Sequence, residues 1–223
     1  MVSLGIKSIK PYLLIFIALF MVLPMQVRGN HFLQEGDLLF CCTDSANAIT
    51  AVTSGVGDQP IDHVAIVHRI GGNNGLLYVI EAVKPVVKLT PIDSFWCENP
   101  HLLVGRVNID MNIPKSVKHC LAMVGKPYDD IYLPGDSALY CSELVQLNYV
   151  DHQDNLIFDP VPMSFHDATG RVTGYWVEFY SQRGMSVPEG AAGSNPGELS
   201  RRPQVTIIGT INNSGKDVVF DWY

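Results

Sequence analysis

The chain has 223 residues, of which 47% are hydrophobic, and its formal net charge at pH 7 is −7. This length fits one substantial domain, and the hydrophobic content is enough for a packed core. The acidic balance argues against nucleic acid or an anionic membrane surface as a partner.

The start of the chain has the pattern of an export signal. Lys7 and Lys10 precede an uncharged apolar run at residues 12–23. Because this run is shorter than the about 20 residues that span a bilayer, we expect residues 1–29 to be a cleaved signal peptide and expect no stable membrane anchor. A retained anchor is the alternative. Cleavage would leave residues 30–223 as one exported domain, periplasmic or extracellular.

The first elements of the mature chain are predicted from its apolar runs. A Gly-Asp turn opens a short apolar strand within residues 36–42, and residues 45–54 have the pattern of a short helix. Two further apolar runs follow at residues 63–70 and 76–82. The five residues between them are all Gly or Asn, which is a strong hairpin signal.

Strands and helices are mixed in the rest of the chain. Further strands are predicted at residues 86–89, 102–107 and 205–211, and helical segments at 91–96, 114–124, 139–150 and 175–182. The end of the chain, from about residue 184 to 223, includes a Gly/Pro/Ser-rich stretch, and we interpret it as an irregular C-terminal arm. Short antiparallel strands with segregated helices predict an α+β fold.

Cys141 lies at the start of a predicted helix. Backbone N–H groups and the helix dipole at such a position stabilise a thiolate, which is the species that attacks a carbonyl carbon. The same N–H groups can receive the oxyanion of a tetrahedral intermediate. The alternative is a structural cysteine in the helix–sheet interface. Tyr140, directly before it, is a candidate for lining a substrate pocket, with a packing aromatic as its alternative.

His63 begins the first strand of the predicted hairpin, and Glu81 ends the second. If Ile70 lies opposite Leu76, Glu81 is diagonal to His63, at about 7–8 Å and within bridging reach of the two side chains. Moving the turn centre by one residue makes them direct partners, whereas an odd shift in the pairing places them on opposite faces.

Asp62 is the competitor to Glu81 for the role of orienting His63. Neighbouring residues of a regular strand point to opposite faces, so a strand that starts before Asp62 would aim its carboxylate away from the histidine. A strand that starts at His63 would leave Asp62 in a loop, from which it could curl back.

Four motifs occur in an order that resembles a known family. They are Gly36-Asp37-Leu38-Leu39-Phe40, Asp62-His63-Val64-Ala65-Ile66-Val67, Glu81-Ala82 and Tyr140-Cys141-Ser142-Glu143-Leu144-Val145. This order is similar to that of the permuted papain-like hydrolases of the NlpC superfamily, and specifically of the YiiX/YebB-like amidase group, in which histidine precedes cysteine. The resemblance runs from about Gly36 to Val150.

The resemblance implies a circularly permuted papain-like core, with an antiparallel sheet packed against the helix that carries the nucleophile. It implies Cys141 as nucleophile, His63 as base and Glu81 as the polar third member. The expected activity is hydrolysis of an amide or related acyl bond, without a cofactor, in a cell-wall peptide or an N-acyl or lipid substrate. An acyltransferase with the same Cys-His-Glu site, or a non-catalytic envelope binding or structural module, is the alternative.

Five cysteines remain after the predicted cleavage, and an odd number leaves at least one thiol unpaired. Adjacent side chains in a strand diverge, so we expect no bond between Cys41 and Cys42. Cys97 and Cys120 are the pair that could form a disulfide. No Cys or His spacing is typical of zinc, so no metal is expected.

Overall fold

The computed structural model describes residues 32–72, 75–135, 137–214 and 218–223. The predicted signal peptide lies outside the described residues. The chain divides into two units, residues 1–33 and residues 34–223. The description below concerns the second unit. None of the helices within the described ranges is long and apolar enough to cross a membrane.

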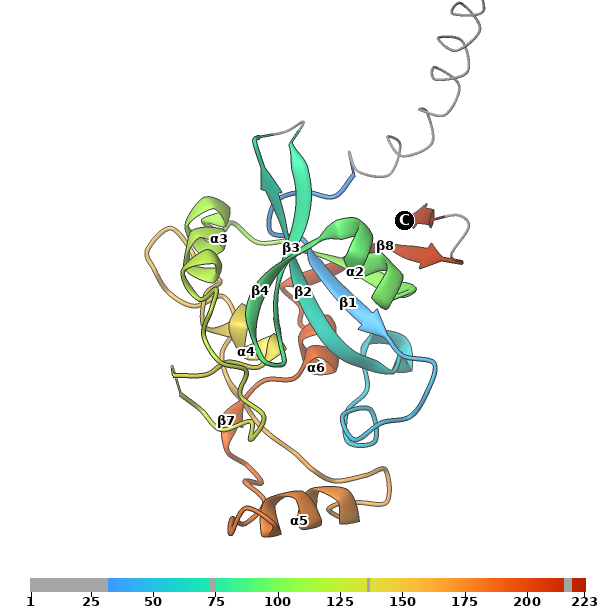
Figure 1. Cartoon of the computed structure of the whole chain (residues 1–223), viewed down its shortest axis with the longest axis vertical. Coiled ribbons are helices and arrows are strands. Elements are labelled where there is room, and N and C mark those ends of the chain that lie inside the picture. Colours follow the sequence, from blue (N-terminus) through green and yellow to red (C-terminus); the bar gives the residue numbers. More distant parts are fainter. Residues whose placement is uncertain (1–31, 73–74, 136, 215–217) are drawn as a thin grey trace, which may run out of the picture. The chain divides into compact units, whose positions relative to one another are not determined.

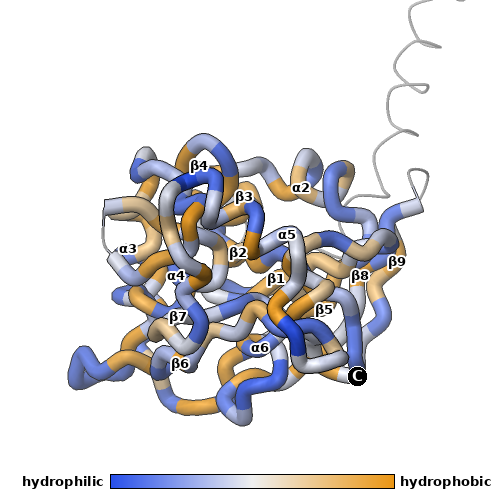
Figure 2. The backbone as a smooth tube through the Cα atoms, turned by 90° about the horizontal axis from the view of Figure 1, so that it is seen from below, coloured by the Kyte–Doolittle hydropathy of each residue, from blue (hydrophilic) through white to orange (hydrophobic). Residues whose placement is uncertain are grey.

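The core of the second unit is a large antiparallel sheet (Figure 1), which within the described residues has seven strands. They are β1 (Leu38–Cys42), β2 (Ile61–Ile70), β3 (Leu76–Val83), β4 (Val86–Pro91), β5 (His101–Val107), β8 (Val205–Asn213) and β9 (Val218–Trp222). The order across the sheet is β4-β3-β2-β1-β5-β8-β9. Hydrophobic stretches run along its strands (Figure 2). The predicted mixed fold with an antiparallel sheet is confirmed.

Short helices and a small second ribbon complete the fold. The helices are η1 (Val56–Asp58), α2 (Ile92–Glu98), α3 (Ile113–Ala122), α4 (Cys141–Gln146), α5 (Gly174–Ser181) and α6 (Pro196–Ser200), and β6 (Val161–Pro162) pairs with β7 (Ala192–Gly193). The helix predicted at residues 45–54 is wrong, since this segment forms turns. There the Asn47 side chain accepts the N–H groups of Ile49 and Thr50.

The helix that begins at Cys141 is much shorter than predicted. It was expected to continue to about residue 150, but α4 ends at Gln146. The reason is local: the Asn148 side-chain amide donates to the Leu144 carbonyl at 2.8 Å, taking the acceptor that the Asn148 backbone N–H would use in a longer helix. The backbone N–H of Asn148 turns instead to the Val145 carbonyl.

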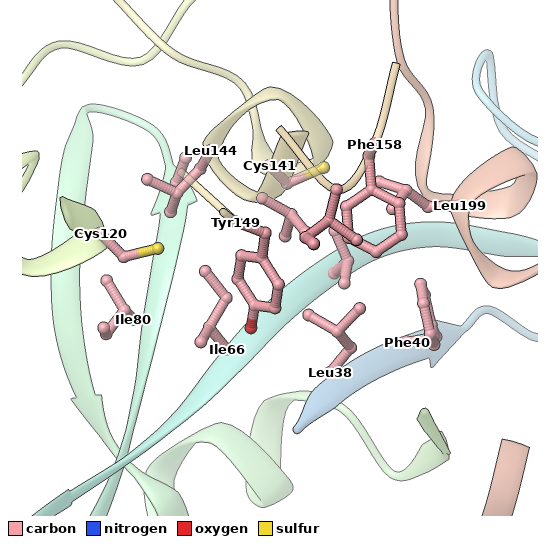
Figure 3. Packing of buried hydrophobic residues seen from close by; sticks show 14 of the residues in the cluster. Leu38, Phe40, Ile66, Ile80, Cys120, Cys141, Leu144, Tyr149, Phe158 and Leu199 are labelled. Carbon is pink, nitrogen blue, oxygen red and sulfur yellow. The ribbon is translucent and has the colours of Figure 1, made fainter. Parts of the chain in front are cut away.

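One face of β1, β2 and β3 packs against α3, α4 and the segment that follows α4. Side chains two residues apart, such as Leu38 and Phe40, enter this core together because strand side chains alternate between faces. Figure 3 shows these side chains with Cys120, Cys141 and Tyr149. The face-alternating pattern that builds the core therefore also fixes which residues of β2 and β3 point away from it.

The C-terminal region is part of the domain and is more regular than the arm that we expected. β8 pairs with β5 from Val205 to Asn212, with a register shift between Val104 and Gly105, and β9 pairs with β8. Leu199 of α6 and Val205 of β8 are buried in the same core as the strands of the hairpin. α6, β8 and β9 therefore supply both part of the core and strands of the main sheet.

Candidate active site

The β2–β3 hairpin has the register that the Gly/Asn loop predicts, with Ile70 opposite Leu76. This register places Glu81 diagonal to His63 on one face of the sheet. The His63 Nε2 and Glu81 Oε2 atoms are 2.9 Å apart. The expectation that the two side chains share a face and meet is confirmed.

Cys141 completes the contact from the other side of the imidazole ring. It is the first residue of α4, with Tyr140 at the N-cap. Cys141 contributes to the raised pKa of His63 through a side-chain hydrogen bond and through its charge. Because Glu81 engages Nε2, Nδ1 is the ring nitrogen that is left for the sulfur. The three residues that the sequence singled out therefore lie in one chain of contacts.

The surroundings of His63 favour its charged form. Burial acts to lower the pKa of His63, but the hydrogen bonds and charges of Cys141 and Glu81 outweigh it and raise that pKa to about 10. The ring is not sealed off, since 18% of the side chain is exposed, whereas only 4% of the Glu81 side chain is. The site thus has a buried carboxylate behind an imidazole that reaches the surface.

Glu81 is held in its ionised form despite burial. Burial acts to raise the pKa of Glu81, but the opposing effects are larger and the pKa is lowered overall. The hydrogen bond and the charge interaction with His63 are the largest of these opposing effects. The Thr90 hydroxyl and the Lys88 ammonium, both on β4, also lower the pKa of Glu81. Neither residue was predicted from the sequence to contact Glu81. The short connection from β3 to β4 could have predicted the contact of Lys88, because it places Lys88 opposite Glu81.

Asp62 lies within β2, which starts at Ile61, as the first of the two alternatives described, but the strand is not regular at this position. Cys41 pairs with His63 and Cys42 with Ile61, so Asp62 is the extra residue of a β-bulge. Its carboxylate accepts a hydrogen bond from the Asn47 side-chain amide at 2.6 Å. The carboxylate in contact with His63 is that of Glu81, and Asp62 instead faces the pocket beside Cys141.

A pocket opens next to Cys141. Its walls include five aromatic side chains, Tyr128, Tyr132, Tyr140, Phe165 and Trp176. Tyr140 is buried and lines the pocket, as one of its two alternatives predicted, and its hydroxyl accepts the Ser194 backbone N–H at 3.0 Å. The other aromatic walls were missed, because their segments are far apart in the sequence and no local pattern brings them together.

All five cysteines, each within the described part of the chain, are free thiols. The pair Cys97 and Cys120 is not bonded, because Cys97 is exposed on α2 whereas Cys120 is buried on α3 in the core. Burial raises the pKa of Cys120 and raises that of Cys42 to about 11. Across residues 32–72, 75–135, 137–214 and 218–223, no group of three or more His, Cys, Asp or Glu is placed to hold a metal ion.

Comparisons with known proteins give the family and the fold of the chain. The model of the permuted papain-like amidase enzymes, the YaeF/YiiX or C92 family, matches residues 32–209. A crystal structure described as the metalloprotein YiiX from Escherichia coli O157:H7 is similar, with 24% identity and a TM-score of 0.61. The match covers 78% of this chain and 94% of that one. This likeness supports the fold. The comparison with curated proteins finds no match.

The thiols differ enough in environment to give a first test of the site. We predict that iodoacetamide at neutral pH modifies Cys141 first, because Cys141 is the first residue of α4, interacts with His63 and lines the pocket. Exposed Cys97 is the natural competitor, and burial raises the pKa of Cys41 well above its usual range. Peptide mapping by mass spectrometry measures the order. Faster labelling of Cys41, Cys42, Cys97 or Cys120 would contradict the assignment. Mapping of Cys97→Ser repeats the measurement without the exposed thiol.

Proposed function

The chain belongs to the permuted papain-like amidase family, and from this membership we propose that it cleaves an amide or related acyl bond through an acyl-enzyme on Cys141. The family assignment makes it a cysteine hydrolase. The observation that carries the choice of residues is the contact chain from the Cys141 thiol through His63 to the buried Glu81 carboxylate. In this proposal the helix α4 carries the nucleophile at its first residue.

The proposed reaction begins with the thiolate of Cys141 and the imidazolium of His63. The sulfur attacks the carbonyl carbon, and N–H groups at the start of α4 are suited to receive the oxyanion. His63 then gives its proton to the departing amine as the C–N bond breaks, leaving a thioester on Cys141. Neutral His63 next takes a proton from water, and the hydroxide attacks the thioester. The C–S bond breaks, which releases the acid and restores the Cys141 thiolate and the His63 imidazolium.

Glu81 orients the histidine in this scheme. With Nε2–H directed at the Glu81 carboxylate, Nδ1 faces the sulfur and can exchange a proton with it. The negative charge also stabilises the imidazolium, which must exist when the leaving amine is protonated.

The charge on His63 defines a pH window. Its pKa rises from the ordinary 6.5 to about 10, so the imidazolium contributes stability fully below about pH 6.5. That contribution is lost as the pH rises through about 10. The same change removes the proton needed for the leaving amine, so activity falls on the alkaline side.

The pocket supports an uncharged, apolar acyl group in preference to a cell-wall peptide. Aromatic side chains of Tyr132, Phe165 and Trp176 form much of its wall. Among the described residues that line it, Asp62 is the one with a charged side chain. A substrate carboxylate close to the scissile bond would meet this carboxylate and find no cation among those lining residues. We therefore propose an N-acyl compound with an apolar acyl chain as substrate.

Substitution of Glu81 tests the roles within the site. Glu81→Gln fills the same space but cannot stabilise an imidazolium, so kcat/KM should fall about 100-fold or more. The alkaline limb of the pH–rate profile should move to lower pH, while the thermal midpoint changes little. Asp62→Asn is the matched control, because its carboxylate bonds Asn47 rather than His63. Equal losses in the two variants would contradict the assignment of Glu81.

The pocket predicts a preference between two matched substrates. The p-nitroanilide of pentanoic acid should be cleaved at least about tenfold faster than that of glutaric acid, which has the same chain length and carries a terminal carboxylate in place of a methyl group. A tenfold difference corresponds to about 1.4 kcal/mol. Phe165→Ala should weaken the preference. A faster glutaryl substrate would reject the apolar-acyl proposal. Mass spectrometry of the product separates hydrolysis, which gives the free acid, from transfer to an added amine.

Export is part of the proposal and is tested on its own. The charged and apolar pattern of the first 29 residues supports a mature chain that begins near Asn30. The N-terminal mass of protein recovered outside the cytoplasm should match that start. Recovery of the full-length chain in a membrane fraction would instead support the retained anchor.

A further inference from the structure

The second oxygen of Glu81 has its own partners on β4. Glu81 is the direct cross-strand partner of Lys88, and Val79 is that of Thr90, so Thr90 is diagonal to Glu81. Lys88 and Thr90 are two residues apart and therefore share a face of the strand. The Thr90 hydroxyl donates to Glu81 Oε1 at 2.5 Å, and Lys88 Nζ lies 3.6 Å from the same oxygen.

These contacts answer a physical need of the buried carboxylate. Oε2 is engaged by His63, so without Thr90 and Lys88 the other oxygen of this buried carboxylate would lack its hydrogen bond and its counter-charge. An ionised carboxylate in such a place is unfavourable unless it is paired and hydrogen-bonded. The Thr90 hydroxyl is buried with it, while Lys88 keeps 41% of its side chain exposed and brings a positive charge from the surface.

The charges along this line alternate in sign. When Cys141 and His63 form a thiolate–imidazolium pair, the order is negative, positive, negative and positive, ending at Lys88. Each charge then has an opposite neighbour, and the group as a whole is neutral. A neutral Glu81, or one turned away from His63, would leave the imidazolium without its counter-charge.

We propose that Thr90 and Lys88 are positioning residues of the active site, which keep Glu81 ionised and aimed at His63. This inference rests on the proposed function, because it assigns them an effect on His63 and Cys141 that passes through Glu81. Thr90 supplies the direction, since a hydroxyl hydrogen bond fixes one oxygen and thereby the plane of the carboxylate. Lys88 supplies charge, and its exposure predicts that added salt weakens its share.

A purely structural Thr90 would affect stability but not the titration of a residue that it does not contact. The experiment therefore follows two quantities in the full mature chain. One is the pH midpoint at which the His63 ring loses its charge, measured by ¹⁵N NMR of the imidazole. The other is the rate of Cys141 alkylation by iodoacetamide at pH 7, with Cys97 in the same sample as the internal reference.

Thr90→Val removes the hydroxyl at nearly constant volume. We expect the His63 midpoint to fall by about one pH unit, which is a tenfold change in the imidazolium-to-imidazole ratio, and Cys141 alkylation to slow severalfold. Thr90→Ser keeps the donor and should stay within about twofold of the wild type. An unchanged midpoint in a folded Thr90→Val protein overturns the role of Thr90.

Lys88→Gln gives a second test that is independent of core packing, because the residue is half-exposed. It should lower the midpoint less than Thr90→Val does, and the difference from the wild type should shrink in high salt. Lys88→Arg should retain the wild-type midpoint. Lys118→Gln, an exposed change of the same charge on α3, is the control and should have no effect.

The experiment distinguishes failure of the proposed function from failure of the proposed role of Thr90 and Lys88. If wild-type Cys141 reacts no faster than Cys97, the proposed function falls and this inference falls with it. If wild-type Cys141 is activated but neither Thr90→Val nor Lys88→Gln moves the His63 midpoint, only the inference on β4 is overturned.

Discussion

The pairing register of β2 with β3 is the constraint on which the rest of the site depends. A slip of one residue would turn Glu81 to the face opposite His63 and break the 2.9 Å contact. The same slip would turn either Ile66 or Ile80 out of the core, because each alternates with a site residue along its own strand. Burial on one face of the hairpin therefore protects the geometry on the other. The short loop between the strands leaves little freedom for another pairing.

Burying the charges of His63 and Glu81 costs free energy, and the interactions between these neighbouring groups offset that cost. Desolvation disfavours both the imidazolium of His63 and the carboxylate of Glu81, yet the pKa shifts of both favour the charged forms. Each charge is stabilised because its neighbour is also charged and within hydrogen-bonding reach. Removal of one member therefore does more than delete a contact, because it leaves the next buried charge unpaired. Such coupling makes the members of the site interdependent.

The parts of the site that the sequence predicted are those set by local pairing. His63 and Glu81 belong to one hairpin, and Cys141 lies at a helix start that a short motif marks. The bulge at Asp62 was not predictable, because it arises where β2 pairs with β1, a strand about 20 residues away. The length of α4 was missed for a different reason: one side-chain amide, that of Asn148, competes for a backbone acceptor.

The pocket walls depend on contacts between residues still farther apart in the sequence. The residues that shape the pocket are therefore different from those proposed to carry out the reaction. Gly193 packs so closely that a Cβ atom there would lie 2.2 Å from the Met163 sulfur, and the neighbouring Ser194 N–H binds the Tyr140 hydroxyl. These contacts hold the wall against the residue just before Cys141, without touching His63 or Glu81 in any described contact. The sheet and α4 thus fix the reacting groups, whereas the long connections around Phe165 and Gly193 shape what can reach them. Changes in those connections can alter the substrate while the contact between His63 and Glu81 stays in place, since the hairpin register that makes it is independent of them.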